Sequence, residues 1–168
     1  AWLPETPKAS LLLVHGLGEH SGRYEGMVSK LNELGVAVFT FDGRGHGKSA
    51  SGKPTAYFDS YEDYLKDIDV LFGKVKAYLP GKPSFLYGHS MGGGLVAAYV
   101  LKYKPQAKGL IMSSPATNLF SSCSIFDAIK LLCNTRRCAA SPWLIHSAEI
   151  CTAKSDMRGT LKVLLNGT

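Results

Sequence analysis

Four short apolar segments alternate with longer stretches of helical periodicity along the first 115 residues. The segments are residues 11–15, 36–42, 84–88 and 109–113. Each is apolar at consecutive positions, as expected of a strand that is covered by helices on both faces. Because strands that alternate with helices are typical of βαβ units, we predict an α/β fold with a central parallel sheet and helices on both of its faces.

Three stretches between and after these segments have the periodicity of amphipathic helices. Residues 22–34 and 61–79 repeat apolar side chains at intervals of three and four, and residues 90–103 follow the third segment directly. Ser60 and Asp63 fit a capping box at the start of the second helix. The helices therefore connect successive strands in the manner that a parallel sheet requires.

A serine-containing motif lies between the third strand and the third helix. Gly88, His89, Ser90, Met91 and Gly92 fit the pattern G-x-S-x-G, in which a serine occupies a sharp turn from a strand into a helix. A glycine-rich turn with an incidental serine is the alternative, but the predicted strand before the motif and the helix after it favour a nucleophile. Ser90 is therefore the candidate catalytic serine.

A nucleophilic serine also needs N–H donors for the oxyanion that forms when it attacks a carbonyl group. The backbone N–H of Met91, directly after the serine, is the expected first donor. Residues 15–18, with the sequence HGLG, follow the first strand, and we predict the N–H of Leu17 as the second donor. For His15 we favour a hydrogen-bonded structural side chain over a catalytic role.

Three motifs, each at the end of a predicted strand, resemble one family. Residues 15–24 (HGLGEHSGRY), 41–49 (FDGRGHGKS) and 88–93 (GHSMGG) are similar to the monoglyceride lipase and lysophospholipase-like branch of the α/β-hydrolases, which is grouped with the serine aminopeptidases (S33, Hydrolase_4 type). The resemblance implies a serine ester hydrolase that cleaves monoacylglycerols or related lipid esters through an acyl-serine intermediate. It also implies that no metal and no organic cofactor takes part.

The resemblance covers the chain only to about residue 115. We expect residues 1–115 to form the nucleophile half of an α/β-hydrolase core and residues 116–168 to be a divergent tail in place of the cap and the later strands, as in a truncated chain. The catalytic acid and histidine follow the serine in chain order in this fold. Asp127 and His146 satisfy that order, but neither follows a predicted strand, so they are weak triad candidates.

Two alternatives remain open. The chain is either derived from an active esterase or is a catalytically inactive isoform or pseudoenzyme that binds lipid or a protein partner. Asp42 precedes the serine, so we expect it to order its glycine-rich loop rather than to serve as the triad acid. With only four strands, the sheet would have two unprotected edges, which favours aggregation.

The charge and the cysteine content limit the kinds of ligand and partner that we expect. The net charge is +6, but basic residues are spread among acidic ones along the chain, which argues against nucleic-acid binding and leaves anionic lipid as the more plausible partner. All four cysteines lie in the last third, where we expect free thiols. A zinc site is disfavoured because no C-x-x-C pair is present; its ligands would be Cys133, Cys138, His146 and Cys151.

No apolar run approaches the roughly 20 residues of a membrane-spanning helix, and the chain begins without a basic and apolar leader. We therefore expect a cytoplasmic or peripherally membrane-associated protein with a lipid ester as its substrate. The sequence leaves the oligomeric state and the acyl-chain preference open.

Overall fold

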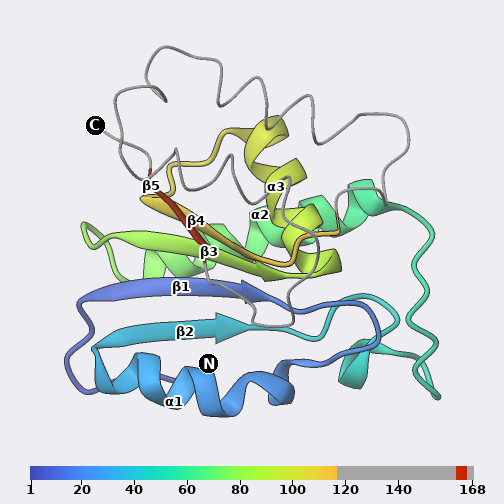
Figure 1. Cartoon of the computed structure of the whole chain (residues 1–168), viewed down its shortest axis with the longest axis horizontal. Coiled ribbons are helices and arrows are strands. Elements are labelled where there is room, and N and C mark those ends of the chain that lie inside the picture. Colours follow the sequence, from blue (N-terminus) through green and yellow to red (C-terminus); the bar gives the residue numbers. More distant parts are fainter. Residues whose placement is uncertain (117–161, 166–168) are drawn as a thin grey trace.

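One sheet of five strands organises the residues that the structure, a computed structural model, describes: residues 1–116 and 162–165 (Figure 1). The strands run in the order β2-β1-β3-β4-β5. Their bounds are Ala9–Val14 (β1), Val36–Thr40 (β2), Ser84–His89 (β3), Gly109–Ser113 (β4) and Lys162–Leu165 (β5). The first four strands are parallel to one another, which confirms the predicted parallel sheet.

The three predicted helices are present, and a short 3-10 helix after β2 was not predicted. Their bounds are Ser21–Tyr24 (η1), Glu25–Glu33 (α1), Gly47–Ser49 (η2), Tyr61–Tyr78 (α2) and Met91–Tyr103 (α3). The predicted capping box of α2 is wrong, because the Ser60 side chain makes no capping hydrogen bond and Asp63 instead pairs with Lys66 at 2.8 Å. Within the described part of the chain, none of these helices is long and apolar enough to cross a membrane.

Two apolar cores cover the two faces of the sheet. Alternate residues of β1 divide between them: Leu11 and Leu13 pack with Val28 of α1, whereas Leu12 and Val14 belong to the core formed with α2 and α3. Figure 1 shows α1 and the pair of α2 and α3 on opposite sides of the sheet. The continuous apolar runs of β1 and β3 thus arise because both faces of these strands are buried.

The outer strands of the expected four-stranded sheet, β2 and β4, both have further backbone partners, so the prediction that both would be unpaired is wrong. β5 pairs antiparallel with β4, and its four residues, KVLL, gave no turn or periodicity signal in the sequence. At the other edge, Trp2 and Val38 exchange two backbone hydrogen bonds of 2.9 Å. These contacts occupy backbone groups that would otherwise be free to pair with another chain.

The carboxyl ends of the four parallel strands share one edge of the sheet. The loop of residues 15–20 follows β1, residues 41–49 follow β2, Ser90 follows β3 and residues 114–116 follow β4. Ligands of open α/β sheets bind at this edge, outside the carboxyl ends of the strands. The candidate site therefore lies where these four connections meet.

Candidate active site

Ser90 occupies a strained turn between β3 and α3. Its φ is 51° and its ψ is −117°, although a side chain disfavours positive φ. Two backbone hydrogen bonds of 2.9 Å hold this conformation: the Ser90 N–H donates to the Ser113 carbonyl, and the Ala116 N–H donates to the Ser90 carbonyl. Such a turn, known as a nucleophile elbow, projects the serine hydroxyl from the carboxyl edge of the sheet.

Glycines on both sides of Ser90 are required by close backbone packing. A Cβ atom added at Gly88 would lie 2.3 Å from the Gly92 carbonyl oxygen. One added at Gly92 would lie 2.2 Å from the Val14 carbonyl oxygen. The first turn of α3 therefore rests directly on the end of β1, which places Ser90 beside the loop that follows β1.

That loop approaches Ser90 through Gly16. A Cβ atom added at Gly16 would lie 3.2 Å from the Ser90 Cβ atom. The Gly16 N–H already donates to the Glu19 carboxylate at 2.9 Å, and Glu19 also accepts a 2.6 Å hydrogen bond from the Tyr24 hydroxyl. The next N–H along the turn is that of Leu17, whose side chain is exposed. Glu19 thus fixes the turn that carries the predicted second oxyanion donor.

Glu19 is charged within this turn, a role that the sequence analysis missed. Burial raises the pKa of its carboxyl group. The hydrogen bonds from Tyr24 and Gly16 lower this pKa by more than burial raises it, so the net pKa is below its usual value. Arg23 adds an ion pair at 3.0 Å. Glu19 precedes η1 and belongs to no helical repeat, so the sequence held no signal for this role.

Met91, the predicted first donor, begins α3 and its side chain is buried. The first four N–H groups of a helix have no partner within the helix, and the positive end of the helix dipole lies there. The amide after Ser90 therefore belongs to a helix end that favours developing negative charge.

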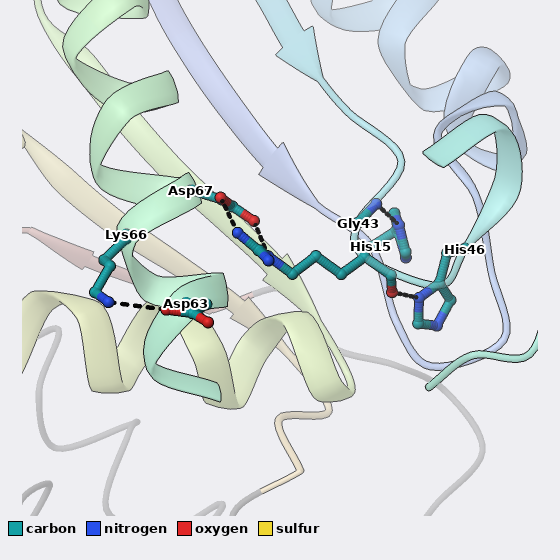
Figure 2. A network of polar contacts seen from close by, with 7 residues as sticks. His15, Gly43, His46, Asp63, Lys66 and Asp67 are labelled. Carbon is teal, nitrogen blue, oxygen red and sulfur yellow. Dashed lines mark hydrogen bonds and ion pairs between the residues drawn. The ribbon is translucent and has the colours of Figure 1, made fainter. Parts of the chain in front are cut away.

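His15 is a structural side chain, as predicted. It is fully buried; its Nδ1 donates to the Gly16 carbonyl at 2.8 Å, and its Nε2 accepts from the Gly43 N–H at 2.9 Å (Figure 2). Burial lowers the pKa of His15, which keeps the ring neutral. Both ring nitrogens are occupied, so His15 joins the loops after β1 and β2 instead of acting as a base.

Asp42 orders the loop after β2, also as predicted. Its carboxylate accepts hydrogen bonds from the Ser21 N–H at 2.7 Å and the Lys48 N–H at 2.8 Å. Burial raises the pKa of this carboxyl group, but these bonds outweigh it and lower the pKa to about 2. A Cβ atom at Gly47 would lie 2.2 Å from Asp42 Oδ2, which explains the glycine there.

In residues 1–116, the rings of His89 and His46 also have hydrogen-bond partners other than the Ser90 hydroxyl. His89 Nδ1 lies 3.1 Å from the Ser113 hydroxyl, and His46 Nδ1 lies 2.7 Å from the Arg44 carbonyl oxygen. The two predicted triad candidates, Asp127 and His146, lie outside the described residues. The disfavoured zinc ligands lie outside them as well. The described part of the site therefore comprises the serine, its turn and the loop that contains the predicted second donor.

A parallel sheet in which a strand passes through a strained serine into a helix defines the α/β-hydrolase fold. The family described as serine aminopeptidase, S33 matches residues 5–156, and the chain belongs to this family.

Curated relatives and solved structures agree with this assignment. The chain is 35% identical to the monoacylglycerol lipase of Mycolicibacterium smegmatis, over 70% of this chain and 41% of that protein. It is 35% identical to the monoglyceride lipase of Homo sapiens, over 68% of this chain and 37% of that protein. The chain thus spans about two fifths of the length of these relatives.

Among solved structures, a thermostable carboxyl esterase from Bacillus coagulans superimposes with a TM-score of 0.65 at 32% identity, covering 77% of this chain and 43% of that one. The monoacylglycerol lipase of Paleococcus ferrophilus superimposes with a TM-score of 0.59 at 36% identity, covering 82% and 51%.

Proposed function

We propose that this chain carries the nucleophile half of a serine ester hydrolase that cleaves monoacylglycerols and related lipid esters. The observation that carries the proposal is Ser90 in its strained turn, with the loop after β1 packed against it. The relatives named monoglyceride lipase support the substrate class. Residues 1–115 are the hydrolase core in this proposal, and residues 116–168 are a tail that differs from the cap and later strands of the family.

The reaction proceeds through an acyl-serine. The Ser90 hydroxyl attacks the ester carbonyl carbon, its proton passes to a base, and the alcohol leaves with a proton; water then hydrolyses the acyl-serine to the free acid. The N–H groups of Met91 and Leu17 stabilise the oxyanion, and losing one such donor costs about 3–4 kcal/mol of barrier. His146, oriented by Asp127, is the candidate base on chain order alone.

A fluorophosphonate probe tests the nucleophile, because it phosphonylates activated serines. The experiment compares the 168-residue chain with Ser90→Ala and with Ser29→Ala, a control at a serine of α1 whose hydroxyl donates to the Glu25 carbonyl. We expect slow labelling that mass spectrometry assigns to Ser90, that is lost in Ser90→Ala and that is kept in Ser29→Ala. Labelling that persists in Ser90→Ala would overturn the assignment.

Fast labelling that is lost in Ser90→Ala would mean that a working base exists in the chain. His146→Asn should then slow the labelling if His146 is that base.

We also propose peripheral membrane association, because lipid esters of this class reside in membranes. Flotation of the chain with phosphatidylcholine vesicles that contain monooleoylglycerol tests this, and a chain that stays at the bottom of the gradient contradicts it.

A further inference from the structure

Lysines gather at the edge of the sheet opposite Ser90. Lys8 and Lys108 directly precede β1 and β4, and Lys82 precedes β3 by two residues. These strands are neighbours in the sheet, about 4.8 Å apart. No Asp or Glu occurs between Asp69 and Asp127. The even spread of charge expected from the sequence is therefore wrong for this edge, because the fold collects lysines from separate loops.

A groove of about 680 Å³ lies at this edge, where α2 and α3 end and β3 begins. Four exposed lysines, Lys76, Lys82, Lys104 and Lys108, belong to its lining and form what we term the lysine rim. The floor is apolar and partly exposed; it includes Leu79, Val100, Leu101 and Ala107. The groove therefore combines positive charge at its rim with an apolar surface between.

The rim lysines have no acidic partner within the described residues. The ion pairs within the described part of the chain are formed by other basic residues: Arg23, Arg44, Lys66 and Lys102. The groove of about 460 Å³ beside β2 differs, because its Arg44 and Asp67 are joined by two hydrogen bonds, of 2.6 and 2.9 Å (Figure 2). Four like charges around one groove repel one another, and a bound anion offsets that repulsion.

The lysine-rimmed groove is separate from the candidate active site. It reaches Ser84, the first residue of β3, whereas Ser90 follows the last residue of that strand. Six residues of strand span about 20 Å, so the two sites lie at opposite ends of β3. A ligand in the groove does not contact Ser90.

We propose that this groove binds the carboxylate of a monomeric long-chain fatty acid at the lysine rim, with the acyl chain along the apolar floor. The volume falls within the range of about 300–1,000 Å³ that small-molecule sites occupy. The site stands on its own geometry and does not require an active Ser90. If the proposed hydrolase reaction takes place, its acid product has the chemistry that this groove recognises.

The test measures binding of 11-(dansylamino)undecanoic acid to the full chain by fluorescence, at concentrations below micelle formation, followed by displacement with oleate. Lys82→Glu/Lys108→Glu reverses two rim charges in loops, and Lys30→Glu/Lys53→Glu reverses two exposed charges elsewhere. We expect the Kd to rise by about tenfold or more in the rim variant and to change by less than about twofold in the control. Ser90→Ala should bind as tightly as the parent chain.

Each other outcome overturns the proposal. Equal weakening in both double variants would mean nonspecific attraction of an anion to a basic protein. Equal displacement by uncharged oleyl alcohol would mean that the lysines play no part. Binding to phosphatidylserine vesicles without binding of monomeric fatty acid would make the edge a membrane contact. Since Ser90→Ala is included, failure of the fluorophosphonate test leaves this result interpretable.

Discussion

At the scale of single residues, the Asp42 carboxylate holds two segments of the site edge together. Asp42 accepts hydrogen bonds from the backbone N–H groups of Ser21 and Lys48. These bonds join the segment before α1 to the loop after β2. Its sequence position, after a strand and among glycines, indicated this role before the structure did. Glu19 could not be predicted in the same way, because its partners meet only when the turn at Gly16 closes.

We predict that Asp42→Asn lowers the free energy of unfolding by about 1–2 kcal/mol at pH 7. The folded pKa of about 2 lies below the ordinary value, so the charged carboxylate stabilises the folded state above about pH 4. That contribution is lost as the pH falls from 4 to 2. Urea denaturation of both proteins across this range should show the difference shrinking, and Glu5→Gln serves as an exposed control. A difference that is constant with pH would contradict the assignment.

At the scale of elements, the turn from β3 into α3 was the most predictable feature of the chain. The motif, the apolar strand before it and the helix after it agreed with one another, and the structure confirmed the bounds within one residue. The capping of α2 was not predictable from the residue types at Ser60 and Asp63. A carboxylate on an exposed first turn has several partners within reach, and here Lys66 binds it.

We predict opposite effects for two glycine-to-alanine substitutions in helices. Gly92→Ala should destabilise the fold by about 2–4 kcal/mol, because its Cβ atom would meet the backbone of β1 at 2.2 Å. Gly73→Ala in α2 should stabilise by about 0.5–1 kcal/mol, since nothing lies within 4 Å of the added atom and alanine favours the helix. Thermal unfolding measures both. Similar changes in the two variants would show that the packing of α3 on β1 is looser than described.

At the scale of the whole molecule, hydrophobic patterning predicted the parallel sheet and its two covered faces, because both depend on which residues are apolar. It did not predict the pairing at the two edges. Trp2 and the residues of β5 lie far in sequence from the strands they join, and backbone hydrogen bonds leave no mark on residue type. The lysine rim was not predicted for the same reason, since its members come from α2, from the end of α3 and from the loops before β3 and β4.

We predict that the 168-residue chain hydrolyses 1-monooleoylglycerol no faster than about tenfold above its Ser90→Ala variant. A serine hydroxyl is a poor nucleophile until a base accepts its proton. The ring nitrogens of His15, His46 and His89 that form hydrogen bonds do so with groups other than the Ser90 hydroxyl. Residual acceleration of about 10³–10⁴ over water from the oxyanion hole alone is compatible with this. Glycerol release measures the rate. A kcat within the usual enzyme range of about 1–10³ per second would contradict the prediction.

The backbone conformation at Ser90 also affects which substitutions evolution can favour at this position. Glycine adopts positive φ without steric cost, whereas serine there costs on the order of 1 kcal/mol or more. Folding alone would thus favour glycine at position 90, while catalysis would require the hydroxyl. A copy of this gene released from catalytic demand can gain stability by losing its nucleophile in one substitution, and restoring activity would then mean giving up that stability.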